Sequence, residues 1–357
     1  MTQNTKNRRL STYAYLTIII AGLLSLLYVG SNIIFPIIFA FFLALLLLPA
    51  VKRLQKIGFN HFWSSISTVF VISSVMFAFA YLLYFQGSVL VNEFSEDNKT
   101  AQIEPEKVIE DVVDGATETV GLSKSKKRST SKAIFDKVVS FSGTYLGTFF
   151  SGLQETLFFL ILTPIYVFFM LYYRMNLFEF IKKRSKEESR ESNLKTLKSI
   201  EEMAQKYLRG LVVVIFIVAC LNIITLFAFG IQSPIFLGLV SGILIVIPYI
   251  GVAIGGAVPT IIALMTKDSY WIAIGVASSY AFVQFLEGNF ITPKIIGDST
   301  NLNPLVIIIG IVVLGALGGV LAMIVAVPLF ASVKIILENS KNYKEFALLL
   351  KNNITKP

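Results

Sequence analysis

The sequence has very little of the chemistry on which soluble enzymes depend. Among its 357 residues it contains one cysteine, Cys220, and one histidine, His61. A single cysteine excludes an internal disulfide, and one histidine cannot build a cluster of metal ligands. The sequence also lacks a phosphate-cradling glycine loop and a serine-elbow motif. We therefore predict that the protein is not an enzyme and that it binds neither a metal nor a cofactor.

Charged residues are scarce as well. They make up 15% of the chain, whereas 55% is hydrophobic, and the mean hydropathy is +0.73. A chain of this length and apolarity is typical of a polytopic membrane protein and not of a soluble domain. The net charge of +9 does not indicate nucleic-acid binding, because the basic residues lie next to apolar runs and not on a soluble module. We predict an all-α fold that crosses a lipid bilayer.

Six apolar runs are long enough to cross the hydrocarbon, which takes about 20 residues of helix. They are Leu10–Gly30, Ile33–Ala50, Trp63–Phe85, Leu146–Tyr173, Leu211–Gly230 and Ser269–Glu287. Basic residues precede the first run and follow the second, and the C-terminal tail is also basic. Because cytoplasmic loops of membrane proteins are enriched in Lys and Arg, both termini are predicted to be cytoplasmic.

Two polar regions separate these runs. An acidic stretch follows the third run and is predicted to lie outside the cytoplasm. A basic stretch follows the fourth run, and its apolar side chains recur at helical spacing, which predicts an amphipathic helix that either lies on the membrane or packs on the bundle. The predicted regions are three spans (1–85), an extracytoplasmic insertion (86–145), a fourth span (146–173), a cytoplasmic helical segment (174–210), a transport core (211–337) and a tail (338–357).

The same order of apolar segments occurs twice in the C-terminal half. Each of its two full spans is followed by a pair of apolar segments joined at a break that contains glycine. The first pair is interrupted at Pro248 and Gly251, and the second begins at Pro304 and is interrupted at Gly318–Gly319. The first pair has arms too short to cross about 30 Å of hydrocarbon, which favours a re-entrant hairpin. The second pair is either re-entrant or crosses, which would give eight apolar segments. Two hairpins entering from opposite sides would form an inverted repeat, an arrangement that often frames a transport site.

The stretch Tyr280–Gly297 contains the most unusual polar residues of the chain. Four polar side chains lie there among apolar neighbours: Gln284, Glu287, Asn289 and Lys294. Ionisable groups at membrane depth are expensive and usually functional. Gly288 and Pro293 lie on either side of Asn289, and they predict that the helix unwinds at this point to line a cavity. The alternative is that Glu287 lies at the membrane interface and only ends a helix.

Several roles are open for these side chains. Glu287 can exchange a proton for a cation, with neutral oxygen ligands from Gln284 and Asn289. Alternatively, Lys294 pairs with Glu287 as a structural latch. Two residues from other segments complete the predicted binding set: Tyr249, which offers a hydroxyl to the cavity or an interfacial ring, and Asn222, which binds a ligand or a neighbouring helix.

Four motifs of the C-terminal half resemble the autoinducer-2 exporter family, a family of permease-like bacterial membrane proteins. They are IPYIG at Ile247–Gly251, QFLEGNFITPKIIG at Gln284–Gly297, NPLVIIIG at Asn303–Gly310 and GALGGVLAMIVAVPLFASVKIIL at Gly315–Leu337. The resemblance implies a multi-pass transporter of the bacterial cytoplasmic membrane that assembles as a homo-oligomer. Members are associated with export of the signalling furanone autoinducer-2, and others with exchange of sodium or lithium for protons.

Three functions follow from these observations. The favoured one is a secondary exporter or permease of a small polar solute similar to autoinducer-2. The second is a Na⁺(Li⁺)/H⁺ antiporter that uses Glu287. The third is a membrane scaffold without transport activity, in which one of the polar regions binds a partner protein.

Overall fold

The computed structural model of the protein describes residues 22, 25, 28–100, 161–185, 187–247, 250–267, 269–297, 299–340 and 343–352. Within these ranges the chain is helical, and its one β-bridge joins Leu302 to Lys351. The chain forms two compact units. Unit 1 comprises Met1–Val69, Leu162–Gln205 and Thr300–Pro357, and unit 2 comprises Phe70–Ile161 and Lys206–Ser299. Each unit is described by itself.

The predicted all-α membrane fold is confirmed. Among the described residues, four helices are long and apolar enough to cross a membrane if the kinked helix Pro304–Glu338 is counted as one, or five if a bent pair of helices also counts as one span. The first predicted span, Leu10–Gly30, lies mostly outside the described residues. Helix α2 (Ser31–Lys56) contains the second and α3 (His61–Thr100) contains the third. Helix α3 continues 15 residues beyond Phe85, so the polar insertion begins as helix, and the insertion's residues 101–145 lie outside the described part.

The end of the fourth span forms a bend. The helix Ile161–Tyr172 is followed by α6 (Arg174–Arg184), and the two are bent by 51°. In unit 1 the helix Ile161–Tyr172 packs on α2 and on the start of α3 through buried Val167 and Leu171. The preceding part of the predicted span, 146–160, lies outside the described residues.

Helix α7 (Glu187–Ala228) is a single helix of 42 residues. The sequence predicts a boundary at residue 210 between an amphipathic segment and a membrane span, but the structure has no break there. In unit 1 the amphipathic part packs through buried Ile200, Met203 and Ala204, and Met203 contacts the core around Leu302 and Ala331. Of the two predicted alternatives, packing on the bundle holds for this part of α7.

Helix α12 (Pro304–Glu338) is a hairpin of two arms. Pro304 occupies the first turn, and Asn303 caps it by accepting a hydrogen bond from the Leu305 amide. Gly318 and Gly319 have non-helical backbone angles. The arms fold back on one another, because a Cβ on Gly310 would lie 2.4 Å from the ring of Phe330. At 1.5 Å per residue the arms 304–317 and 320–338 measure about 21 and 28 Å.

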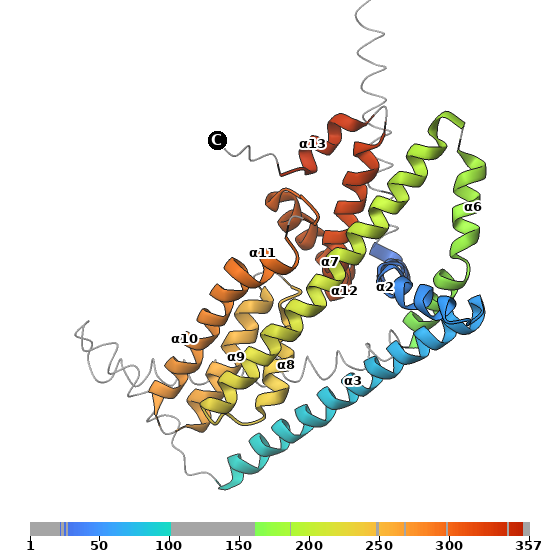
Figure 1. Ribbon diagram of the computed structural model, residues 1–357. Coiled ribbons are helices and arrows are strands. Elements are labelled where there is room, and N and C mark those ends of the chain that lie inside the picture. Colours follow the sequence, from blue (N-terminus) through green and yellow to red (C-terminus); the bar gives the residue numbers. More distant parts are fainter. Residues whose placement is uncertain are drawn as a thin grey trace, which may run out of the picture. The chain divides into compact units, whose positions relative to one another are not determined.

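In unit 2 a second hairpin packs against α7 and α10 (Tyr270–Leu286) (Figure 1). Its arms are α8 (Pro234–Leu244) and α9 (Ile250–Thr266), which are about 17 and 26 Å long. The break between them contains Pro248, which lies outside the described residues. Gly251 lies in the first turn of α9, where a Cβ would be 1.7 Å from the carbonyl oxygen of Leu244, so only glycine fits there.

Helix α10 (Tyr270–Leu286) does not unwind at its end, which differs from the prediction. It continues as a π-helical turn, Glu287–Ile291, and then as α11 (Thr292–Ile295). Proline has no N–H and its ring crowds the preceding turn, so a wider turn lets the chain remain helical through Pro293. A Cβ on Gly288 would meet open space, so this glycine is not required for the turn.

Replacing Gly319 by alanine tests the α12 hairpin. Gly319 has φ of 64° and ψ of −153°, a region that is almost closed to residues with a side chain. We expect Gly319→Ala to destabilise the protein by about 1–3 kcal/mol, measured as a lowered thermal unfolding midpoint in detergent. The matched control is Gly288→Ala, which has helical geometry and open space and is expected to be neutral or slightly stabilising. Equal midpoints for the two variants would contradict the hairpin turn.

Candidate functional site

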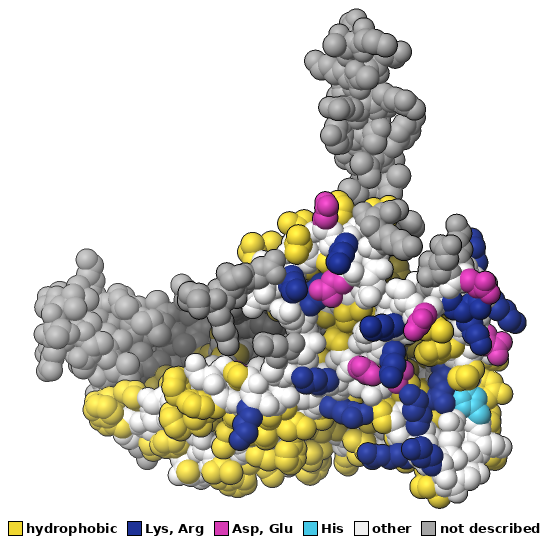
Figure 2. Space-filling view, turned by 45° about the horizontal axis from the view of Figure 1, so that its top comes forward, with side chains coloured by type: hydrophobic (Ala, Val, Ile, Leu, Met, Phe, Trp, Pro, Cys, Tyr) yellow, Lys and Arg dark blue, Asp and Glu magenta, His cyan; other side chains and the backbone are white. Residues whose placement is uncertain are grey.

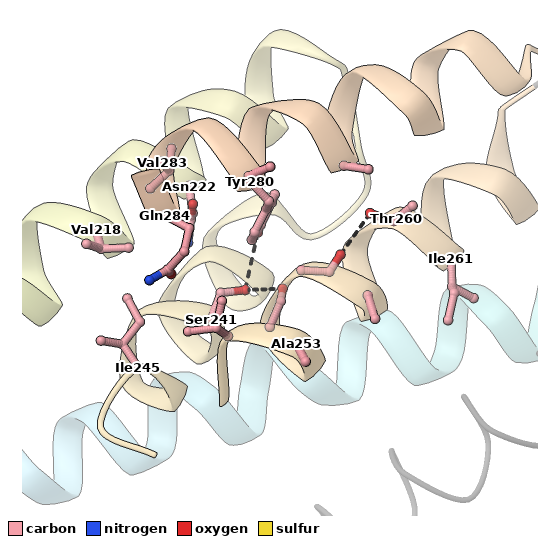
Figure 3. Close-up of a pocket in the computed structure, with 16 residues that line it drawn as sticks. Val218, Asn222, Ser241, Ile245, Ala253, Thr260, Ile261, Tyr280, Val283 and Gln284 are labelled. Atoms are coloured by element: carbon pink, nitrogen blue, oxygen red, sulfur yellow. Dashed lines mark hydrogen bonds between the residues drawn. The ribbon is translucent and has the colours of Figure 1, made fainter. Parts of the chain in front are cut away.

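A pocket of about 590 Å³ lies within unit 2, between α7, α8, α9 and α10 (Figure 3). Its walls are mainly small apolar residues, among them Val218, Ala253 and Ala277. The helices approach closely around it, because a Cβ on Gly242 of α8 would lie 3.0 Å from the Cα atom of Ala219 on α7. This volume is typical of a small-molecule site.

The first polar group of the pocket is the Ser241 hydroxyl, which contacts two other helices. Ser241 Oγ on α8 lies 2.8 Å from the carbonyl oxygen of Gly255 on α9 and 3.2 Å from the Tyr280 hydroxyl on α10. Thr260 Oγ1 donates to the Gly256 carbonyl at 2.8 Å on the same wall. Ser241 Oγ also lies 2.6 Å from the carbonyl oxygen of Leu237, so the hydroxyl hydrogens of Ser241 and Thr260 are used on backbone carbonyls and their oxygens remain as acceptors (Figure 3).

Asn222 supplies a second polar group, from the middle of the apolar half of α7. It lines the pocket, it is 3% exposed, and its Oδ1 has no hydrogen-bond partner among the described residues. An unpaired buried acceptor costs about 1–3 kcal/mol, so such groups need an explanation. A bound solute with a hydroxyl or amino hydrogen would satisfy this oxygen. The predicted alternative, a hydrogen bond from Asn222 to a neighbouring helix, is not formed with any described residue.

Gln284 connects the pocket to Glu287. The Gln284 side chain lines the pocket, and its Nε2 donates to Glu287 Oε2 at 2.7 Å. The other carboxylate oxygen, Oε1, accepts a hydrogen bond from Thr292 Oγ1. Glu287 is 9% exposed, so it does not simply end a helix in solvent. Both of its carboxylate oxygens accept hydrogen bonds from side chains, and Glu287 is not among the residues that line the pocket.

The other predicted binding residues do not join this group. Asn289 is exposed, and its side-chain amide donates to the Phe285 carbonyl of its own helix at 2.9 Å. Lys294 is also exposed and forms no ion pair with any described residue, so the predicted latch between Lys294 and Glu287 is absent there. The structure brings together Asn222, Gln284 and Glu287 and separates Asn289 and Lys294 from them. Tyr249 lies outside the described residues.

Sequence reasoning missed Ser241, Tyr280 and Thr260. Serine and threonine within apolar helices commonly bond to their own backbone, so nothing in the local pattern distinguishes Ser241 or Thr260. Tyr280 begins the unusual polar stretch, and its position one helical turn before Gln284 is a usable signal, because residues four apart share a helix face. The contact between α8 and α10 that unites Ser241 and Tyr280 cannot be read from spacing.

The pocket is electrically neutral. None of its lining side chains is charged, and its hydrogen-bonding groups are amides and hydroxyls. Among the described residues, no group of three or more His, Cys, Asp or Glu side chains could hold a metal ion. The arrangement is suited to hydrogen bonding with an uncharged polar molecule.

The fold and the pocket together define a polytopic helical membrane protein with a solute-sized site between its helices. The family model for AI-2E family transporters matches residues 16–342, and the chain belongs to this family. The protein is therefore a multi-pass membrane transporter.

Its relatives come from several bacteria. The chain is 28% identical over 313 residues to "Putative transport protein YrrI" of Bacillus subtilis (strain 168). The matched residues cover 86% of this chain and 86% of the relative. It is 26% identical over 339 residues to "Putative permease PerM" of Escherichia coli (strain K12), covering 91% of this chain and 92% of the relative. It is also 32% identical over 113 residues to "AI-2 transport protein TqsA" of the same organism, covering 32% and 33% of the two chains.

Replacing Asn222 by leucine separates a binding role from a structural one. Because the amide oxygen is unpaired, we expect Asn222→Leu to leave the stability unchanged or to raise it by about 1 kcal/mol. The thermal unfolding midpoint in detergent checks this. A fall in stability would show that Asn222 has a structural hydrogen bond. The matched control is Asn289→Leu, which replaces an exposed amide that is engaged with its own helix.

Proposed function

We propose that the protein carries a small, uncharged, polar solute across the membrane and that the pocket between α7 and α10 is its binding site. The single observation that supports this most strongly is the pocket itself, which combines a solute-sized volume with neutral hydrogen-bonding groups only. A hydroxylated furanone such as autoinducer-2 has the size and the hydroxyl groups that this site suits. The similarity to a protein named as an AI-2 transporter points the same way.

In this proposal Asn222 and Gln284 bind the solute directly. The unpaired Asn222 Oδ1 accepts a hydrogen from a solute hydroxyl. One of the two N–H groups of the Gln284 amide donates to Glu287, so its second N–H and its carbonyl oxygen remain for the solute. Ser241 adds a hydroxyl from α8, and Tyr280 adds another from α10. Groups on α7, α8 and α10 then act on one molecule, which makes the affinity depend on how these helices are arranged.

Glu287 has a positioning role in this proposal. Its carboxylate accepts hydrogen bonds from Gln284 and Thr292, which fixes the orientation of the Gln284 amide toward the pocket. Burial of a carboxylate is tolerated when its oxygens are paired in this way. Substitution of Glu287 is expected to weaken transport through the misplaced Gln284.

An antiporter of Na⁺ or Li⁺ against H⁺ is the alternative. The buried Glu287 carboxylate favours it, because a carboxylate that exchanges a proton for a cation is the minimum that such a cycle needs. Two observations weigh against it. Both carboxylate oxygens are engaged by side chains, and the pocket has no charged group that could ligate a cation. The scaffold alternative makes no use of the pocket.

We further propose that the protein resides in the bacterial cytoplasmic membrane with both termini in the cytoplasm, and that it forms homo-oligomers. The basic residues in the last turn of α2 and those of α6 support this orientation. The regions predicted from the sequence, with a transport core at residues 211–337, remain a proposal. In it the hairpins α8–α9 and α12 form an inverted repeat, with each hairpin following a long helix.

The test uses proteoliposomes loaded with labelled autoinducer-2 and with an internal pH dye. We expect the wild type to release the solute faster than empty liposomes, and Asn222→Leu to lower this rate at least tenfold, since a lost hydrogen bond to solute costs about 1.4 kcal/mol or more. Glu287→Gln should lower it less, because the amide keeps one acceptor oxygen. The control Asn289→Leu should transport normally.

Each other outcome supports a different function. A pH gradient that collapses on addition of Na⁺, Li⁺ or K⁺ in the wild type but not in Glu287→Gln would establish antiport and overturn the neutral-solute proposal. Absence of both solute release and cation response would favour the scaffold. Equal release by the wild type and Asn222→Leu would remove the pocket from the transport path.

A further inference from the structure

Helix α6 exposes its apolar side chains although it follows a membrane span. None of its 11 residues is buried. Met175, Leu177 and Phe180 are 54, 51 and 64% exposed. The helix also carries four basic residues and one acidic residue, Glu179, and its last turn contains Lys182, Lys183 and Arg184. A helix with exposed large apolar groups and clustered basic groups is typical of one that lies in the membrane interface.

The bend before α6 turns the helix away from the direction of the preceding span. The helix Ile161–Tyr172 is apolar, and α6 deviates from it by 51°. A continuation without a bend would carry Leu177 and Phe180 farther into solvent. The bend therefore keeps these side chains nearer to the level at which the span ends.

The first residues of α6 are tied to the turn between α2 and α3, all within unit 1. Arg174 Nη2 donates to Gln55 Oε1 at 3.1 Å, and His61 Nε2 lies 2.7 Å from the carbonyl oxygen of Tyr172. The His61 and Tyr172 rings stack at 5.5 Å. Three helix ends, those of α2, α3 and the helix Ile161–Tyr172, therefore meet at one level.

The turn between α2 and α3 has the same character as α6. Ile57, Phe59 and Trp63 are 76, 46 and 57% exposed, and Arg53 and Lys56 occupy the last turn of α2. In Figure 2 dark-blue Lys and Arg side chains gather near the cyan histidine. Aromatic side chains next to basic ones at the ends of apolar helices mark the boundary between hydrocarbon and headgroups.

We propose that α6 and the α2–α3 turn form one interfacial surface that binds the headgroups of anionic phospholipids. The basic residues of this surface are Arg53, Lys56, Lys182, Lys183 and Arg184. Its apolar side chains enter the acyl boundary while the basic groups contact the phosphates. Charge complementarity selects the occupant, since a neutral leaflet would offer the five cations no counter-charge.

The part of α7 that follows α6 in unit 1 buries apolar side chains, in contrast to α6. In that part Ile200, Met203 and Ala204 are buried, and Glu201 forms an ion pair with Lys52 at 2.8 Å. These three side chains of α7 thus have protein partners, whereas Met175, Leu177 and Phe180 are left for the bilayer. Lys52 and Arg174 bind side chains of other helices and are not counted as part of the lipid surface. Lys183 is counted because its only ion pair among the described residues is with Glu179 of its own helix, at 3.8 Å, and both side chains are exposed.

The two tryptophans provide a matched pair of reporters. Trp63 lies on the proposed surface, and Trp271 lies at the start of α10 in unit 2 and is 65% exposed. The experiment measures quenching of tryptophan fluorescence by brominated phosphatidylglycerol in otherwise unbrominated phosphatidylcholine liposomes. Trp271→Phe leaves Trp63 as the reporter, and Trp63→Phe leaves Trp271.

We expect brominated phosphatidylglycerol to be enriched about three- to fivefold at Trp63 over its bulk fraction, since each basic group contributes about a fivefold preference and the contributions are not additive. Enrichment should be absent at Trp271. The variant with Arg53, Lys56, Lys182, Lys183 and Arg184 all replaced by glutamine should lose it, and about 0.5 M salt should reduce it through screening. The charge control replaces Lys344 and Lys351 at the C-terminal end and should keep it.

Two results would overturn the proposal. One is quenching of Trp63 at the bulk fraction of phosphatidylglycerol, which would mean that the surface does not select anionic lipid. The other is enrichment that survives the fivefold glutamine variant, which would place the lipid on other groups. Circular dichroism of each variant confirms that it is folded. Every altered side chain except the half-buried Lys351 is exposed, so folding is expected to be retained.

Discussion

A helical hairpin that is too short to cross the bilayer must be covered by protein, and much of unit 2 follows from this constraint. Backbone groups that a break in a helix leaves without partners cannot be satisfied by lipid. The helices α7 and α10 enclose the hairpin, and glycine at positions such as Gly242 allows α7 and α8 to pack backbone to backbone. The pocket lies among these same helices and is lined mainly by their small residues.

The polar groups of unit 2 are distributed according to their tasks. Glu287 is the most expensive group to bury, and it has two hydrogen-bond donors of its own, Gln284 and Thr292. Asn222 is less expensive to bury, it lines the pocket, and its Oδ1 has no hydrogen-bond partner among the described residues. The charged residue is thus satisfied by the protein, whereas the proposed function pairs the neutral one with a neutral solute.

Much of the architecture could be predicted from the sequence, because the lengths of apolar runs and the prolines or glycines that interrupt them are local signals. The third span and the breaks near Pro248 and at Gly318–Gly319 are examples, and the start of α12 at Pro304 is another. The continuity of α7 across residue 210 was not predictable from a change in polarity, because helix formation depends on backbone hydrogen bonds and not on the solvent around the helix. The same holds for α3 beyond Phe85.

The site was predicted in part. Gln284 and Glu287 could be found because polar groups among apolar residues are rare, and Asn222 because it lies alone in a long apolar run. Asn289 and Lys294 give an equally strong local signal, yet they point away from the pocket. The π-helical turn from Glu287 to Ile291 contributes to this, since one extra residue rotates everything that follows relative to α10. Such a rotation cannot be read from residue spacing.

Protection of a thiol placed in the pocket tests most directly whether this pocket binds the transported solute. In a Cys220→Ser background, Ala257→Cys adds one sulfur atom to the wall of the pocket, and Asn289→Cys places the same group on the exposed side of the π-helical turn. The rate of alkylation is measured with and without autoinducer-2 in liposomes. The solute is predicted to slow alkylation at position 257 in a concentration-dependent manner and to leave position 289 unaffected. Equal rates at position 257 with and without a solute that the protein demonstrably transports would contradict the pocket as its binding site.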